Sequence, residues 1–474
     1  MKMKNLNKYI FLIGSFVALL SISSCTKSFL DQKPYTSIAS EDALKTPADI
    51  KTALNGTYAN LRNGELRGAA VPLLGDLLAD NIYLSSSNIG LFNGENAYSI
   101  TTDGAYSNRV WFFAYANILQ ANNIIDAPLN KGTDVLQYKG EAYAIRALLY
   151  FDLVRLFGKS YTIAPNTLGV PIVLHYDPTI LPKRNTVAEV YAQILSDLDQ
   201  AINLMSQYNG SARFSKYAAI ALKAKVNLYK GNYQDAYDLA NDVLKNSGFT
   251  PVSRTALAGY WSAATPHDQA NKVETLFELV SDAFNHNGAD ELSMHYVQDD
   301  NSEGEMLSTQ SLFDAYTSTD VRKNLIIKGV RNRLGGEDPA YIVNKYPVVA
   351  GDFNEKKVIR LSEVQLIAAE AAYRITKESE ALTLLNQLVA QRDASLIYTS
   401  TGATLLADII NERRKELAFE GDRFFDLNRL NQDIMRTEEY PSGIIKAGDY
   451  RRVMPIPLGE INVNPNIIQN PDYH

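Results

Sequence analysis

The sequence predicts a mainly α-helical protein in which packed helix pairs are interrupted by long loop-rich insertions and a few short strands. Two segments, 111–126 and 141–158, carry apolar residues at helical spacing over several turns. A pattern of small and aromatic residues recurs in two later parts of the chain, as a helical repeat would. Between residues 249 and 357 the helical period fades while Gly, Asn, Asp and Ser become frequent, which is typical of loops.

Two further helices are expected on either side of these segments. Residues 47–62 place apolar side chains close to helical spacing, and residues 187–205 do the same. Segment 81–108 is rich in Ser, Asn, Gly and Tyr and has neither a helical nor a strand period. A long irregular segment inside a compact domain is usually a mobile or a functional loop, and we expect one here. Residues 275–280 are predicted to form a short strand.

The recurring pattern begins at Ala224 and ends at Ala236, with a glycine and a tyrosine between them. It is similar to a tetratricopeptide helix–turn–helix, in which small residues let paired helices approach closely. Ala369 and Ala381 recur with the same separation. The repeats are degenerate and far apart, so they predict a helical scaffold that carries insertions rather than a regular solenoid.

Composition restricts the classes of partner. The formal net charge is -7, and the chain has no basic runs, which argues against nucleic acid and anionic lipid headgroups as partners. Tyrosine is abundant, with 28 residues against 17 Phe and 2 Trp. Because tyrosine combines a flat apolar face with a hydroxyl group, this composition suits wet interfaces and sugar stacking.

The N-terminus has the features of a secretory signal. Three lysines precede an apolar run at 9–22, which is shorter than the roughly 20 residues of a membrane-spanning helix. The sequence Ile-Ser-Ser-Cys that ends at Cys25 resembles a bacterial lipobox. Cys25 is also the only cysteine, which excludes a disulfide within the chain and any multi-cysteine metal site. We therefore predict a signal peptide at 1–24 and a lipid anchor on Cys25.

Residues 410–429, INERRKELAFEGDRFFDLNR, place Arg413 and Arg414 on a helical face among apolar side chains. Arginine stays charged, so a buried stripe of this kind needs carboxylate or carbonyl partners. The local carboxylate candidates are Glu416, Glu420 and Asp422. Alternating signs let neighbours neutralise one another, which favours a structural ion network over an acid/base array. Gly421 is expected to adopt the left-handed conformation that stops a helix.

Several motifs resemble the SusD/RagB family. The motif ERRKELAFEGDRFFDLNR closely resembles its C-terminal signature. Other parts of the chain resemble the family in the right order: FLDQKP at 29–34, the helices at 111–126 and 141–158, VIRLSEVQLIAAEAAY from Val358, and the tail from PIPL at 455–458 to Gln469-Asn470-Pro471. The resemblance covers nearly the whole chain.

The resemblance implies a SusD-like fold and a role in nutrient uptake. Members are surface lipoproteins that act as a lid on a SusC-like TonB-dependent outer-membrane transporter. It implies an N-terminal helical region at 25–248 and a C-terminal region at 249–474, packed as one globular unit, with the loop-rich insertion at 249–357. We expect a lipid-anchored protein on the outer membrane, exposed at the cell surface.

Motifs for catalysis, metals and cofactors are weak. The five histidines are scattered, and the sequence has no HExxH pair, no nucleotide-binding Gly-rich loop and no GxSxG elbow. A partial calcium motif comprises Asp299, Asn301, Glu303 and Gly304, but Gln310 stands where a bidentate glutamate belongs. A glycosidase would need two facing carboxylates, and no pair stands out. We expect no cofactor, no metal and no enzymatic activity.

The sequence favours a binding surface built from aromatic residues in loops. The predicted ligand contacts are Tyr83, Tyr98, Trp261, Phe284 and Tyr296, each with packing in the core as the alternative. The loops 81–108 and 260–296 that carry them are expected to converge on one surface. The predicted function is capture of glycan oligosaccharides for import. A RagB-like peptide-binding lipoprotein, a secreted glycoside hydrolase and a helical-repeat adaptor are the alternatives.

Overall fold

The structure is a computed structural model, in which residues Thr46–His474 form one compact unit. It describes residues 44–177, 179–262, 271–298, 302–331, 335–348, 353 and 355–473. The predicted signal peptide at 1–24 and Cys25 lie outside the described residues. Asp299 and Asn301 of the partial calcium motif lie outside them too.

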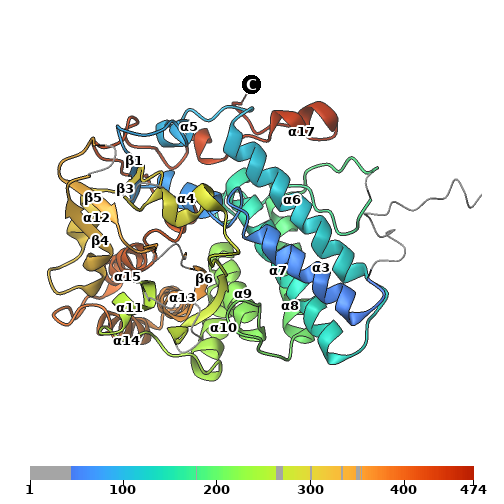
Figure 1. Cartoon of the computed structure of the whole chain (residues 1–474). Coiled ribbons are helices and arrows are strands. Elements are labelled where there is room, and N and C mark those ends of the chain that lie inside the picture. The colour runs from blue at the N-terminus through green and yellow to red at the C-terminus, as the bar shows by residue number, and fades with distance from the viewer. Residues whose placement is uncertain are drawn as a thin grey trace, which may run out of the picture. The chain divides into compact units, whose positions relative to one another are not determined.

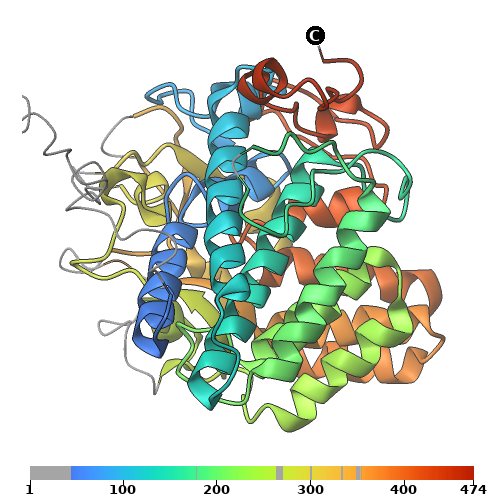
Figure 2. The ribbon, with the colours of Figure 1, turned by 90° about the vertical axis from the view of Figure 1, so that its right-hand side faces the viewer.

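The N-terminal half is a set of long helices packed side by side (Figures 1 and 2). They are α3 (Pro47–Leu61), α6 (Ala105–Asp126), α7 (Thr133–Phe157) and α8 (Val187–Leu204). Thr46 and Thr186 cap α3 and α8 with reciprocal capping boxes, which satisfy free N–H groups at both helix starts. Helices α6 and α7 begin earlier than the predicted 111 and 141, because periodicity marks only the turns that face the core.

Two helix pairs form the repeat scaffold. They are α9 (Lys216–Lys230) with α10 (Tyr233–Asn246), and α13 (Leu361–Arg374) with α14 (Glu378–Val389). Ala224, Ala236, Ala369 and Ala381 are all fully buried, as the predicted close approach of paired helices requires. Helix α10 packs against both α9 and α13, so the two pairs stack although they are distant in sequence. This confirms the interrupted repeat architecture.

Shorter helices and two small sheets fill the remaining part of the described chain. The helices are α4 (Ala70–Leu77), α5 (Asn93–Ala97), α11 (Leu257–Ser262), α12 (Gln310–Ala315), α15 (Gly402–Glu416), α16 (Arg423–Arg429) and α17 (Leu458–Val463). One sheet has the order β1-β3-β5-β4, formed by Ile82–Leu84, Met306–Ser308, Ala340–Val343 and Ile326–Gly329. The other pairs β2 (Thr275–Leu279) with β6 (Lys356–Arg360). All these pairings are antiparallel.

Strand β2 lies where the sequence predicts a strand. Residues 358–360 belong to β6, so the helix expected from Val358 begins only at Leu361. None of the helices in the described ranges is both long and apolar enough to cross a membrane.

A close backbone contact locks α4 against the loop before α16. Gly421 has φ +83°, the left-handed conformation predicted for it. A Cβ atom built on Gly75 would lie 1.9 Å from the Gly421 carbonyl oxygen, and one on Gly421 would lie 2.4 Å from Pro72 Cα. Only glycine fits at both positions, which brings the signature segment directly onto α4.

The signature segment is the centre of a buried ion network, as predicted. Arg413 is buried and contacts Asp426 (Nε to Oδ2, 2.7 Å) and Glu363 (Nη2 to Oε1, 3.0 Å). Arg414 is less deeply placed and donates to the Asn81 side chain and the Asp80 carbonyl. Charges of opposite sign thus lie within ion-pair distance of one another, as expected for a structural network.

The predicted local carboxylates are buried, but their partners come from elsewhere. Glu416 contacts Arg322, Arg360 and Arg392; Glu420 contacts Lys345 and Arg360; Asp422 contacts Lys225. Although burial acts in the opposite direction, these cations hold the pKa of all three carboxyl groups below the usual range. The segment therefore binds cations from five other positions in the chain, in addition to its internal pairs of Asp426 with Arg413 and Arg429.

Candidate functional site

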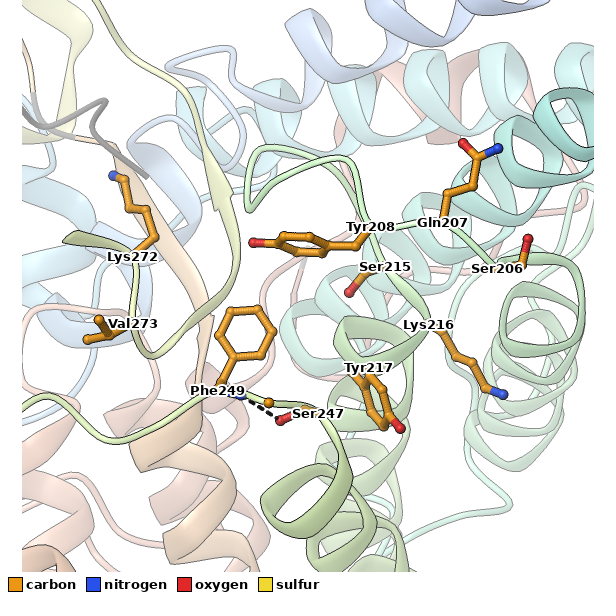
Figure 3. A pocket seen from close by; sticks show the side chains of 11 residues that line it. Ser206, Gln207, Tyr208, Ser215, Lys216, Tyr217, Ser247, Phe249, Lys272 and Val273 are labelled. Atoms are coloured by element: carbon orange, nitrogen blue, oxygen red, sulfur yellow. Dashed lines mark hydrogen bonds between the residues drawn. The ribbon is translucent and has the colours of Figure 1, made fainter. Parts of the chain in front are cut away.

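An open pocket of about 530 Å³ lies where the loop after α8, the start of α9, the loop after α10 and the residues before β2 meet. Three aromatic residues line it: Tyr208, Tyr217 and Phe249. Figure 3 shows the rings of Tyr208 and Phe249 side by side in the pocket. Their centroids are 5.9 Å apart with the planes at 79°, an edge-to-face pair. The pocket thus offers aromatic faces at an accessible surface.

Local hydrogen bonds position the loop that carries Tyr208. Buried Gln137 of α7 accepts through its side-chain oxygen from the backbone N–H groups of Ser206 (3.1 Å) and Gln207 (3.0 Å). The Gln207 amide donates to Asp134 at 2.9 Å. These hydrogen bonds connect Ser206 and Gln207 to α7. They therefore fix the backbone that carries the half-exposed ring of Tyr208.

Amide, hydroxyl and ammonium groups stand beside the rings. Gln207, Ser206 and Ser247 supply neutral polar groups, and the side chain of Lys216 points outward at the start of α9. Lys272 is buried instead and is paired with Glu278 (3.1 Å) and Glu355 (2.9 Å). Such a lining can bind a polyhydroxylated ligand by stacking and hydrogen bonding. It contains no Asp or Glu, and therefore no pair of carboxylates for glycoside cleavage.

The pocket residues were missed by the sequence analysis. Tyr208 precedes Asn209-Gly210, a turn signal between two amphipathic helices, and Phe249 follows Gly248, which has φ +80°. The signal in the sequence that could have identified these two residues is an aromatic side chain next to a turn between helices. The aromatic residues predicted as ligand contacts all come from long aperiodic segments instead.

Four of the five predicted ligand contacts are core residues. Tyr83, Tyr98, Trp261 and Tyr296 are all buried, so their ring faces are not presented to a ligand. Tyr83 packs in a cluster with Leu307, Ala340 and Tyr440. Tyr98 donates its hydroxyl hydrogen to the Leu78 carbonyl, and Tyr296 lies against Tyr346 and Phe419. The structure corrects the expectation for these four residues in favour of the packing alternative.

Trp261 has a specific structural role. Three buried cations surround its ring, Lys345 at 4.2 Å, Lys357 at 4.7 Å and the Arg360 guanidinium at 5.1 Å from the ring centroid. Lys345 and Arg360 belong to the ion network around Glu416 and Glu420. The indole face therefore contributes to holding a cluster of like charges inside the protein.

Phe284 is the predicted contact that remains accessible, with 94% of its surface exposed. The Asp282 carboxylate accepts from the backbone N–H groups of Phe284 (2.8 Å) and Asn285 (2.7 Å), which fixes the turn beneath the ring. The neighbouring His286 ring lies 4.8 Å from that of Phe353. An apolar ring held out in water on an ordered turn is an available stacking surface.

The two aromatic segments do meet, but inside the protein. Phe92 and His295 make an edge-to-face contact at 5.7 Å, and both are buried. Convergence of the loops therefore builds core structure in addition to any surface. In the described ranges, no three His, Cys, Asp or Glu side chains gather as a metal site.

Comparison with known proteins identifies the architecture. A family model described as "Starch-binding associating with outer membrane" matches residues 28–228, and the "SusD family" model matches residues 343–473. A solved SusD superfamily protein of Bacteroides thetaiotaomicron is 30% identical, with a TM-score of 0.82 over 90% of this chain and 100% of that chain. The chain belongs to the SusD/RagB family.

Other relatives agree with this assignment to the SusD/RagB family. A SusD superfamily structure from Bacteroides vulgatus is 27% identical, with a TM-score of 0.81 over 90% of this chain and 99% of the other. A SusD-like protein of Formosa agariphila is 25% identical over 97% of this chain and 98% of its own length. The resemblance stated from the sequence motifs is therefore confirmed over most of the chain.

Proposed function

We propose that this SusD-family protein binds oligosaccharides at the outer membrane and presents them to a SusC-like TonB-dependent transporter for import. The pocket at Tyr208 and Phe249 is the observation that carries the proposal, because it combines accessible rings with amide, hydroxyl and ammonium groups. The description of the matching family as starch-binding and associated with the outer membrane supports the same conclusion.

The chemistry of the pocket suits sugars. One face of a pyranose ring presents C–H groups that stack on an aromatic ring, while its hydroxyl groups need polar partners at the edge. The pocket volume of about 530 Å³ lies in the range of small-ligand sites. Because the pocket is open, it admits an internal part of a longer chain, and affinity without an enclosing partner is expected to be weak.

Phe284 is proposed as a further stacking residue for the same oligosaccharide. It lies beyond the C-terminal end of β2, whereas Lys272 and Val273 of the pocket lie before its N-terminal end. We propose that one ligand of several sugar units contacts both positions, which lie beyond opposite ends of the buried strand β2. Phe284 thus remains in the proposed binding surface, together with Tyr208 and Phe249.

Titration of the purified protein with a panel of polysaccharides and their oligosaccharides tests the proposal. Tyr208→Ala and Phe284→Ala should each weaken binding about three- to tenfold, the usual effect of one stacking contact. Tyr176→Ala is the matched control for Tyr208, because both side chains are 55% exposed. Phe112→Ala, at an exposed position outside this pocket, is the control for Phe284. All four variants should melt within a few degrees of the wild type.

The results separate the proposed function from its alternatives. Binding of a peptide panel with no binding of any polysaccharide would replace the glycan proposal with the RagB-like one. Release of reducing ends from a bound polysaccharide would indicate a glycoside hydrolase. If polysaccharide binds but all four variants bind equally well, the ligand site lies elsewhere on the protein.

Anchoring and partner are part of the proposal. A lipid on Cys25 would hold the chain at the outer membrane without a spanning helix. A SusC-like transporter would then enclose ligand from the other side and add the affinity that an open pocket lacks. Co-purification of such a transporter with the chain from outer membranes, strengthened by the oligosaccharide, is the expected result.

A further inference from the structure

A second cavity, of about 370 Å³, lies beside α15 and is lined by three arginines. Arg374 is the last residue of α13, Arg414 lies in the last turn of α15, and Arg423 is the first residue of α16. Helix α15 packs against α13 (Figure 1), so three helix ends meet at this place. We call it the arginine pocket. It shares no lining residue with the pocket of Tyr208 and Phe249.

One face of α15 forms the floor of the arginine pocket. Ala403, Ala407, Ile410, Asn411 and Arg414 recur at three- or four-residue spacing on this face and line the cavity. The opposite face, which includes Ile409, Arg413 and Glu416, is buried. The two alanines leave the cavity open, while the apolar floor reduces competition from water for the polar groups around it.

The arginines keep donors that the protein does not use. Arg423 directs Nε (2.7 Å) and Nη2 (2.9 Å) to the Asp80 carboxylate, and Arg414 directs Nε to Asn81 (2.9 Å) and Nη2 to the Asp80 carbonyl (3.0 Å). Among the described residues, the Nη1 groups of Arg414 and Arg423 have no hydrogen-bond acceptor. The Nε of Arg374 also lacks an acceptor, but it is buried, so Arg374 can reach a ligand in the cavity only through its terminal N–H groups. A guanidinium group has five N–H donors, so unused donors surround this cavity.

The positive charge of the arginine pocket is only partly compensated. No Asp or Glu lines the cavity. Asp80 is paired bidentately with Arg423 and lies 3.9 Å from Arg414. Glu370 lies 3.6 Å from Arg374 but makes its two short contacts, 2.7 and 2.6 Å, with Arg429. Burial lowers the pKa of Arg414, and the charge of Arg423 lowers it further against the opposing effect of Asp80.

We propose that the arginine pocket binds an oxyanion, a carboxylate or sulfate group, carried by a sugar unit of the ligand. A planar fork of guanidinium donors matches the geometry of such an oxyanion and gives hydrogen bonds about twice as strong as neutral ones. Asn411 and Gln432, which also line the cavity, supply amide groups for sugar hydroxyls. The apolar floor accommodates the sugar ring. The inference rests on the proposed function for the saccharide part and extends it to a preference for acidic glycans.

Two variants test the pocket with little disturbance of the fold. Arg374→Gln removes a guanidinium whose side chain is 27% exposed and that makes no short ion pair. Asn411→Glu places a carboxylate at an exposed lining position on the surface of α15. Thr404→Glu is the matched control, because it adds the same charge to an exposed position of the same helix outside the lining. Each variant is titrated at low ionic strength with glucuronate oligosaccharides, sulfated galactan oligosaccharides, neutral glucose oligosaccharides and inorganic sulfate.

The acidic oligosaccharides should bind the wild type more tightly than the neutral ones. Arg374→Gln and Asn411→Glu should each weaken acidic binding about tenfold or more, the first because a charge-assisted contact is lost and the second because the new carboxylate repels the oxyanion. Thr404→Glu should leave it unchanged, and added salt should weaken it. Whether the carboxylated or the sulfated series responds identifies the oxyanion. Neutral oligosaccharides should bind all variants equally.

Failure of this inference is distinguishable from failure of the proposed function. Equal affinity for acidic and neutral oligosaccharides, unchanged in both pocket variants, would overturn the arginine pocket and leave glycan binding intact. No binding of any saccharide, together with stabilisation by sulfate that is lost in both variants, would overturn the saccharide part and leave an oxyanion site. No response to any of the four ligands would overturn both.

Discussion

Removal of the Arg413 side chain tests the buried ion network most directly. In Arg413→Ala, Asp426 keeps Arg429 at 2.8 Å and Glu363 keeps Lys225 at 2.8 Å, so each carboxylate retains one cation. Breaking a buried pair usually costs about 3–5 kcal/mol, and this residual pairing places the loss near 3 kcal/mol. Arg414→Ala loses two hydrogen bonds to neutral oxygen atoms, while Asp80 keeps Arg423, and should cost only about 1–2 kcal/mol.

Denaturant unfolding at pH 7 measures both losses, with Arg413→Met as a control that retains most of the side-chain volume. Arg413 and Arg429 hold the pKa of Asp426 well below its usual value although burial acts to raise it. The stability from this pairing is therefore complete above the unfolded-state pKa of about 4 and disappears as the pH falls below it. The difference between wild type and Arg413→Ala should shrink accordingly. An Arg413→Ala loss no larger than that of Arg414→Ala would refute this account.

Three further outcomes are expected. Burial raises the pKa of Asp76 to about 7, so between pH 4 and 7 the folded state holds a proton that the unfolded state has released. The free energy of unfolding of the wild type should therefore fall, relative to that of Asp76→Asn, as the pH rises from 4 to 7. Parallel pH profiles of the two proteins would contradict this. Gly421→Ala should lower the melting temperature strongly, because its Cβ would meet Pro72 and its φ is positive; an unchanged melting temperature would show that the loop can move away from α4. Labelled palmitate should enter the wild type and not Cys25→Ala, and equal labelling of both would exclude this anchor.

The sequence predicted the features that depend on local order along the chain. The apolar period of α7 and the recurring small residues Ala224 and Ala369 were enough to predict the helices and their pairing, because a helix repeats its contacts every three to four residues. The signature from Glu412 to Arg429 identified the family. It also predicted that Arg413 is buried among carboxylates, since an arginine on an apolar face must find partners.

Only the tertiary structure decided which aromatic residues are accessible. Tyr83 and Phe284 both lie in aperiodic segments, yet Tyr83 is buried beneath strands that arrive more than two hundred residues later, while Phe284 stands on a turn with nothing over it. The exposure of a ring depends on what packs against it, and aperiodic backbone carries no signal of those contacts.

The partners of the buried charges were likewise decided by the fold. Glu416 lies three residues from Arg413 in sequence, but its ion pairs are with Arg322, Arg360 and Arg392. The arginine pocket follows the same principle, because Arg374, Arg414 and Arg423 come from three different helices. An arginine that becomes buried must find partners, and the packing of distant helices determines which charges are buried and which carboxylate compensates each one.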